Sequence, residues 1–305
     1  MESFILEMLN RNYSVHLKKI VLRSVVGYSN VFIADCKQPL VIKIINSDYD
    51  RSIFLEQLYQ ALNQTNNSLL PIKSINNSYL SYFNGKVFSV FKKVELCESA
   101  PQTIWWAETL SEIHNLTLPY QPNAMIRYTI TFAEQLLMKA SHYFTTETYI
   151  LLSDILNDAE EYKDNISTTD LVVCHGDTQL RNVMCIGQNN VLIDFDNCGF
   201  AIREYDIQRM VFDYLMETLD LAFCKQFLRR FLLQYERLQK KKISHESLLY
   251  AFEVDFVQTF SWLTAYVNSS DLPDIDRQKQ EWNRYEHTIS SGLIKEFITM
   301  LKTFI

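Results

Sequence analysis

The 305-residue sequence holds only 6 glycines and 6 prolines, too few for long flexible linkers or a repeat array rich in these residues. No apolar run approaches the roughly 18 residues that a membrane-spanning helix needs. The opening residues, MESFILEMLN, lack the basic flank and the unbroken apolar stretch of a signal peptide. The 6 cysteines form no C-x-x-C pair, which favours reduced thiols over disulfides. These absences predict a cytoplasmic protein with no membrane partner.

Basic residues are in the minority, with 29 Lys and Arg against 36 Asp and Glu, and the net charge of −7 argues against a general nucleic-acid-binding protein. Residues 1–100 hold 11 basic and 8 acidic residues, whereas residues 101–305 hold 18 and 28. A mildly basic N-terminal part suits a phosphate ligand and an acidic remainder suits a cationic one, unless the difference is drift in surface charge. Hydrophobic residues make up 48% of the chain, enough to bury a sizeable core. Its length of 305 residues predicts two compact lobes or domains.

The first 95 residues predict strands around a helix. The helix follows from apolar residues at 54, 55, 58, 61 and 62, the spacing of an amphipathic helix over 51–63. A short helix is expected over the opening dozen residues. Runs rich in β-branched and aromatic residues predict strands at 21–26, 31–35, 40–45, 69–75, 79–83 and 86–94.

From Pro101 onward the pattern changes to helix. Helices are predicted over 103–115, twice between 126 and 164, and from about Glu204 to the C-terminus. Two short apolar strands, 171–174 and 191–195, flank a polar loop in the middle of this region. The pattern therefore indicates a chain of the α+β class.

The polar loop carries the residues that point to chemistry. The first strand leads into HGD, which ends at Asp177, and Asn182 follows five residues later. The second strand leads into Asp194-Phe195-Asp196. If a hairpin joins the two strands, Asp177, Asn182 and Asp194 meet at one edge. A carboxylate can orient a hydroxyl and accept its proton, while amide and carboxylate oxygens bind Mg²⁺, so the set suits phosphoryl transfer from a nucleotide.

The pattern H-G-D-x-x-x-x-N, followed 12 residues later by the first aspartate of D-F-D, resembles the aminoglycoside phosphotransferase and choline kinase family, small-molecule relatives of the protein kinases. The resemblance implies that Asp177 is the catalytic aspartate and that Asn182 and Asp194 are Mg²⁺ ligands. The family also has a lysine on an N-lobe strand and a helix glutamate that holds it. Lys43 in LVIKII and Glu56 in IFLEQLYQAL fit these two roles.

The resemblance also implies a nucleotide site for ATP, with GTP as an alternative. The turn SVVGYSN corresponds to the family's nucleotide loop, where Ser29 and Asn30 would lie near the phosphates. The stretch FSVFKKVE corresponds to the hinge between lobes. There the backbone of Lys92 and Val94 would contact the adenine edge, with Phe91 beside the pocket.

The sequence departs from the family pattern at a few positions. The nucleotide loop has a single glycine, and only 13 residues separate Lys43 from Glu56. Asp196 stands where protein kinases have the glycine of D-F-G, and it either approaches a second metal or accepts backbone hydrogen bonds. Asp206 resembles a downstream aspartate of the family with a structural role. His175 is interpreted as a hydrogen-bonding residue that shapes the loop.

The fold implied by the resemblance is a two-lobe, protein-kinase-like α+β architecture. Residues 1–95 would form a nucleotide-binding N-lobe, an antiparallel sheet with one helix. Residues 96–305 would form a mainly helical C-lobe with the catalytic loop and the acceptor site.

The implied activity is transfer of a γ-phosphate to the hydroxyl of a small molecule, in particular a cationic aminoglycoside-like or amino-alcohol acceptor. Two alternatives stay open, a protein Ser/Thr kinase of the same fold and a non-catalytic nucleotide-binding protein. The short segment between Asp196 and Asp206 counts against the protein kinase, because it leaves little room for a peptide-binding activation segment. The oligomeric state is left open. Acids that could bind a cationic acceptor, or simply face solvent on helices, are Asp154, Asp158, Glu160, Glu161, Glu253 and Asp255.

Overall fold

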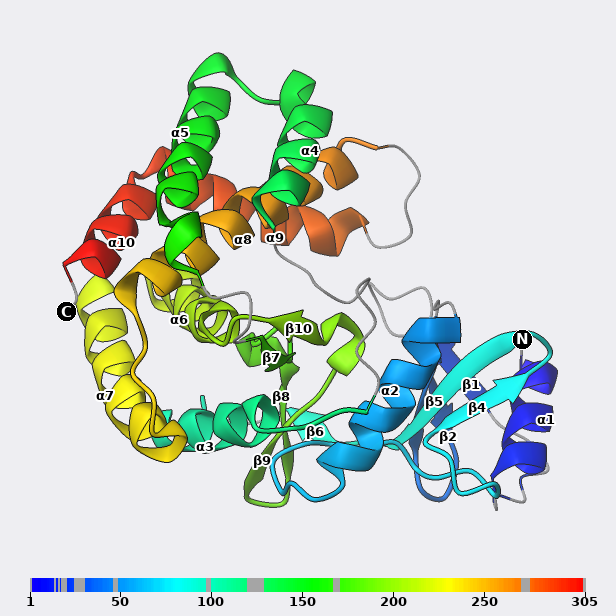
Figure 1. The fold of residues 1–305 in the computed structure, drawn as a ribbon. Coiled ribbons are helices and arrows are strands. Elements are labelled where there is room, and N and C mark those ends of the chain that lie inside the picture. The colour runs from blue at the N-terminus through cyan, green and yellow to red at the C-terminus, as the bar shows by residue number, and fades with distance from the viewer. Residues whose placement is uncertain are drawn as a thin grey trace. The chain divides into compact units, whose positions relative to one another are not determined.

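The computed structural model of the protein forms two compact units that interleave along the chain (Figure 1). The first unit comprises residues 1–99, 116–122 and 183–196, and the second comprises residues 100–115, 123–182 and 197–305. The structure describes residues 2–13, 15, 17, 21–24, 31–45, 49–96, 100–119, 129–166, 171–269 and 275–303.

A five-stranded antiparallel sheet forms the centre of the first unit. Its order is β1 (Val21–Ser24), β2 (Val31–Asp35), β3 (Leu40–Ile45), β5 (Lys86–Lys92) and β4 (Leu80–Phe83). Helix α1 (Glu2–Asn12) buries Ile5, Met8 and Leu9, at i, i+3 and i+4, in a core shared with apolar residues of β2, β3 and β5. Apolar burial on one face thus holds the sheet and α1 together.

Helix α2 (Tyr49–Leu62) follows β3 directly and is the helix expected from the apolar spacing. A strand predicted over 69–75 does not form. The segment makes single backbone hydrogen bonds, from Leu69 N–H to the Leu192 carbonyl and from Ile72 N–H to the Val90 carbonyl. Pro71 lacks an N–H and interrupts any ladder there.

The strands that flank the polar loop belong to different sheets, so the predicted hairpin between them is wrong. In the first unit, β6 (Glu95–Leu96), β8 (Val183–Ile186) and β9 (Asn189–Leu192) form a three-stranded sheet in that order. In the second unit, β7 (Val172–Cys174) pairs with β10 (Gly199–Ala201). The hydrogen bonds of β7 to β10 and of β8 to β6 join strands that are not neighbours in the sequence, and local periodicity does not predict such pairs.

The second unit is mainly helical, as predicted. Its longest helix, α8, contacts α4, α5, α6, α9 and α10, and the rings of Phe212, Phe252, Phe256 and Tyr285 pack between these helices. Short 3₁₀ helices span Ser141–Tyr143, Lys163–Asn165, Leu180–Asn182 and Phe195–Asn197, the last at the boundary between the units. The helices are α3 (Thr103–His114), α4 (Ile130–Ala140), α5 (Thr146–Tyr162), α6 (Glu204–Thr218), α7 (Leu221–Gln239), α8 (His245–Val267), α9 (Ile275–Ser290) and α10 (Leu293–Lys302).

Within the described part of the chain, no helix is long and apolar enough to cross a membrane. Free thiols are found at Cys36, Cys174, Cys198 and Cys224. Cys185, in contrast, is disulfide-bonded, which corrects the expectation of a reduced thiol at that position.

Candidate active site

Lys43 is the centre of the candidate site in the first unit. It lies on β3, where its Nζ is 2.6 Å from Oδ1 of Asp194 and 2.8 Å from Oδ2 of Asp196. The lysine side chain is only 13% exposed. Burial alone would lower the pKa of Lys43, but the carboxylates of Asp194 and Asp196 outweigh it and raise the pKa above the usual value. Lys43 is therefore a fixed cation between two acids.

Asp194 has a left-handed backbone conformation with φ of 68°. Among residues other than glycine, aspartate and asparagine adopt this conformation most often, but it still costs of order 1–3 kcal/mol and persists only where the surroundings determine it. The turn after β9 is therefore held in one conformation by its contacts, and it carries both carboxylates that face Lys43.

The expected ion pair between Lys43 and Glu56 is wrong for this structure. Glu56 lies on α2, and its carboxylate accepts hydrogen bonds from Tyr79 N–H at 3.1 Å and Leu80 N–H at 2.8 Å. The Ser78 hydroxyl donates a third, at 2.7 Å. Two backbone donors at the start of β4 thus occupy the glutamate, and the lysine pairs with Asp194 and Asp196 instead.

The residues expected near adenine are on the strand next to Lys43. Phe91 lies directly opposite Val41, and Ser89 lies directly opposite Lys43, in the antiparallel pair of β3 and β5. Residues directly opposite each other in such a pair share one face of the sheet, so Phe91 and Lys43 lie on the same face. Lys92 ends β5 and Val94 follows it. Ser29 and Asn30 lie outside the described residues.

Asp177 lies in the second unit, on the loop after β7. The backbone N–H groups of His175 and Gly176 donate to Asp206 at 2.7 and 2.8 Å, and Asp177 N–H donates to Nδ1 of His175 at 3.2 Å. His175 therefore shapes the loop, in line with its interpretation from the sequence. Asp206 is fully buried on α6 and holds the loop in place.

Asn182 is turned toward Asp177 through its amide nitrogen. The side-chain NH₂ donates to the backbone carbonyl and to Oδ2 of Asp177, at 2.8 and 2.9 Å. Hydrogen bonds of the described residues leave the side-chain oxygen of Asn182 unused, so it is available to a cation. This oxygen is a hard donor of the kind that Mg²⁺ prefers, and within the first unit the carboxylates of Asp194 and Asp196 are donors of the same kind.

One face of α6 contacts the loop at three points. Asp206 accepts hydrogen bonds from the start of the loop, and Arg209 lies 3.7 Å from Oδ1 of Asp177. One turn further on, Oδ2 of Asp213 accepts a hydrogen bond from Leu180 N–H at 2.7 Å. Positions 206, 209 and 213 follow the helical repeat, so they share this face. Arg209 and Asp213 were not predicted from the sequence, although charged residues at helical spacing in the apolar run EYDIQRMVFDYLM are a usable signal.

Two arginines lie beside the catalytic candidate Asp177. Nη2 of Arg181, four residues along the loop, is 3.7 Å from Oδ2, and Arg209 approaches Oδ1. Arg209 is held in turn by Asp255 of α8 at 3.3 Å, and Arg181 is held by Glu281 of α9 at 3.4 Å. The structure thus gives Asp177 two cationic neighbours whose positions depend on α8 and α9.

The acids proposed for an acceptor divide into several kinds. Asp255 is buried and accepts from Tyr205 and Gln208 as well as Arg209. Its role is to hold these side chains. Glu253 is buried, and none of the described residues makes a hydrogen bond to either of its carboxylate oxygens. Surface ion pairs engage Asp158 with Lys302 and Glu160 with Lys163, while Asp154 and Glu161 are exposed.

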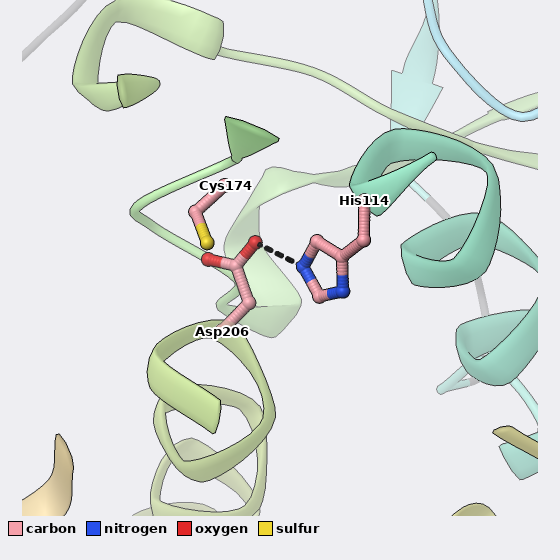
Figure 2. Close-up of side chains that lie close together, drawn as sticks. All are labelled: His114, Cys174 and Asp206. Carbon is pink, nitrogen blue, oxygen red and sulfur yellow. Dashed lines mark hydrogen bonds and ion pairs between the residues drawn. The ribbon is translucent and has the colours of Figure 1, made fainter. Parts of the chain in front are cut away.

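Figure 2 shows a buried group next to the loop that could suggest a metal site, His114, Cys174 and Asp206. The polar atoms of His114 and Asp206 already have partners, Nε2 of His114 with Asp206 at 3.1 Å and Nδ1 with the Tyr235 hydroxyl at 2.6 Å. Burial raises the pKa of the Cys174 thiol well above its usual value, so it stays a protonated donor toward the Ile202 carbonyl. The group is therefore a structural support for Asp206.

Comparison with known proteins identifies the family and the fold of the chain. Residues 22–240 match the family described as the phosphotransferase enzyme family. No curated protein sequence matches the chain. Similar solved structures include a spectinomycin phosphotransferase in complex with ADP and spectinomycin, with 13% identity, a TM-score of 0.72 and coverage of 99% of this chain and 98% of that chain.

Two further structures have the same fold. An amicoumacin kinase in complex with AMP-PNP, Ca²⁺ and Ami has 13% identity and a TM-score of 0.66, with coverage of 95% of this chain and 93% of that chain. A choline kinase from Cryptosporidium parvum has 10% identity and a TM-score of 0.61, with coverage of 99% of both chains. The two-lobe, protein-kinase-like α+β fold predicted from the sequence is confirmed. With more than half of its residues matched, the chain belongs to the phosphotransferase enzyme family, and it is a small-molecule kinase that acts on a hydroxyl group.

Proposed function

We propose that the protein transfers the γ-phosphate of ATP, with GTP as the alternative donor, to a hydroxyl of a small cationic molecule in the presence of Mg²⁺. The pairing of Lys43 with Asp194 and Asp196 supports this function most directly. Mg²⁺-nucleotide binding requires a cation for phosphate oxygens close to carboxylates for the metal, and the first unit supplies both.

In this proposal residues 1–95 bind the nucleotide. Lys43 contacts the α- and β-phosphates, and the backbone of Lys92 and Val94 meets the adenine edge beside Phe91. From their place in the sequence alone, Ser29 and Asn30 are proposed to act near the phosphates. Phe91 and Lys43 share one face of the sheet, as a nucleotide that contacts both would require.

Asp194 and Asn182 are the proposed Mg²⁺ ligands, and the conformation of each supports this role. Lys43 holds Asp194 in a fixed orientation. The amide nitrogen of Asn182 is engaged, while none of the described residues donates to its oxygen. When bound, Mg²⁺ offsets negative charge on the transferred group.

Asp177 is the proposed catalytic residue. Its carboxylate orients the acceptor hydroxyl and takes the proton as the oxygen–phosphorus bond forms and the bond to the leaving diphosphate breaks. The loop that carries Asp177 is held by Asp206 and Asp213, so the carboxylate is positioned before the acceptor binds. Residues 96–305 would also hold the acceptor.

The proposed acceptor is cationic because the chain beyond residue 100 carries 28 acidic against 18 basic residues. Proteins with the same fold include a choline kinase and a Plasmodium vivax ethanolamine kinase, both named for small amines. The positive charge of an amine on the acceptor would be attracted by this excess of negative charge.

The test is a turnover screen with Mg²⁺ and either ATP or GTP. The acceptor panel contains spectinomycin, other aminoglycosides, choline, ethanolamine, neutral sugars and a generic protein. We expect turnover with a cationic acceptor, its loss in Asp177→Ala, and retained binding of AMP-PNP by that variant. The exposed Asp164→Ala is the matched control. Asp194→Ala should lose the Mg²⁺-dependent part of AMP-PNP binding.

Each other result has a distinct meaning. Turnover with the protein substrate alone would indicate a protein kinase. Nucleotide binding without turnover on any acceptor would favour a binding protein. Undiminished turnover in Asp177→Ala would reject the proposed mechanism.

A further inference from the structure

Arg51 connects α2 to the turn that carries the candidate metal ligands. It lies in the first turn of α2 and is buried. Its guanidinium donates to the backbone carbonyl of Asp196 at 2.5 Å and reaches that of Phe195 at 3.5 Å, while its Cζ lies 5.0 Å from the centre of the Phe54 ring. A buried arginine is thus directed at main-chain oxygens within the Asp194–Asp196 segment.

The same helix contacts this segment at a second point. Two turns beyond Arg51, the ring of Tyr59 meets the ring of Phe195 edge to face, with centroids 6.4 Å apart. Arg51 thus contacts main-chain carbonyls of the Asp194–Asp196 segment, and Tyr59 contacts the side chain of its middle residue, Phe195. Both contacts lie within the first unit.

The contacts of Arg51 and Lys43 with this turn are complementary. Lys43 binds the side chains of Asp194 and Asp196, whereas Arg51 binds backbone carbonyls of the same turn. Asp194 has its left-handed conformation directly before the carbonyls that Arg51 contacts. Such a conformation persists when the surroundings determine it, and a guanidinium with several fixed donors suits that purpose.

We propose that Arg51 is a positioning residue for the metal–nucleotide site and that α2 acts on this site through Arg51 rather than through Glu56. The inference rests on the proposed function, because it assumes that Asp194 binds Mg²⁺. Glu56 is engaged by the start of β4, so it leaves the contact with the Asp194–Asp196 turn to Arg51. Loss of Arg51 loosens the turn and misplaces its carboxylates.

The test measures the dissociation constant of AMP-PNP, once with Mg²⁺ and once with EDTA, for the full-length protein. Loss of a residue that orients metal ligands typically costs about 10–100-fold in metal affinity. We therefore expect Arg51→Met to raise the dissociation constant of AMP-PNP in Mg²⁺ by roughly tenfold or more. The dissociation constant measured in EDTA should change little. Arg51→Lys keeps the charge but not the forked geometry, so it should show a partial effect.

Arg11→Met is the matched control. Arg11 is an exposed arginine of the same unit that also lies over a phenylalanine ring, that of Phe83. Its replacement should leave both constants unchanged. Thermal melting of each variant reports whether it is folded. If Arg51→Met does not fold, Arg51→Lys and the intermediate Arg51→Gln carry the test.

The proposal is overturned if folded Arg51 variants keep the wild-type Mg²⁺ effect, or if affinity falls equally with Mg²⁺ and with EDTA. In either case, measurement of Asp194→Ala in parallel shows whether only the role of Arg51 is rejected or the proposed function as well. A wild-type protein whose Mg²⁺-dependent binding is lost in Asp194→Ala keeps the function and rejects only the role of Arg51. A wild-type protein that binds no nucleotide rejects both.

Discussion

The guanidinium of Arg209 lies 3.7 Å from the carboxylate of Asp177 and 3.3 Å from that of Asp255. It also donates to the Tyr285 hydroxyl. A single buried cation therefore joins the loop after β7 to α8 and α9. The position of the proposed catalytic carboxylate depends on residues distant in the sequence, because these fix the arginine beside it.

This relationship predicts strong coupling between Arg209 and Asp255. Removing one partner of a buried ion pair leaves an uncompensated charge and costs about 3–5 kcal/mol. We expect Arg209→Met and Asp255→Asn each to lower the free energy of unfolding, and the double variant to lose clearly less than the sum of the two. Urea unfolding of the four proteins measures this cycle. Additive losses would show that the two residues act independently.

Glu56 provides a second prediction. Glu56→Gln removes a charged acceptor from the N–H groups of Tyr79 and Leu80, so we expect the free energy of unfolding to fall by about 1–3 kcal/mol. The affinity for Mg²⁺ and AMP-PNP should stay within about twofold of wild type. Glu7→Gln, which alters an exposed ion pair on α1, is the control and should change neither quantity. A selective loss of nucleotide affinity would instead indicate that Glu56 pairs with Lys43 once nucleotide is bound.

Glu253 predicts a pH-dependent stability. Burial is the main cause that raises its pKa from 4.5 to about 8, with a further contribution from Asp158. Because the folded protein holds the proton more tightly than the unfolded chain does, the stabilising effect is complete below pH 4.5 and is lost as pH rises to about 8. Each unit of pKa difference corresponds to about 1.4 kcal/mol.

The measurement is urea unfolding at about pH 5 and about pH 9. Glu253→Gln cannot titrate, so its free energy of unfolding should fall less between these pH values than that of the wild type. Glu160→Gln, which changes an exposed acid on α5, should follow the wild type. Equal pH dependence of wild type and Glu253→Gln would contradict the raised pKa.

Much of the fold follows from local patterns. Runs rich in β-branched residues give β2 and β3, and helical apolar spacing gives α2, because each pattern depends on neighbours within a few residues. The dependence on local patterns also explains why the predicted strand over 69–75 does not form. Its apolar composition is local, whereas a strand needs a ladder of hydrogen bonds to a partner.

The candidate site shows the same division. The sequence by itself determined which side chains are proposed for phosphoryl transfer, namely Lys43, Asp177, Asn182 and Asp194, and on which elements they lie. The tertiary structure decided their partners. Lys43 pairs with an aspartate 151 residues away and not with the glutamate 13 residues along the chain. An ion pair forms where side chains meet in space and lose water together, so only the folded chain determines which charges pair.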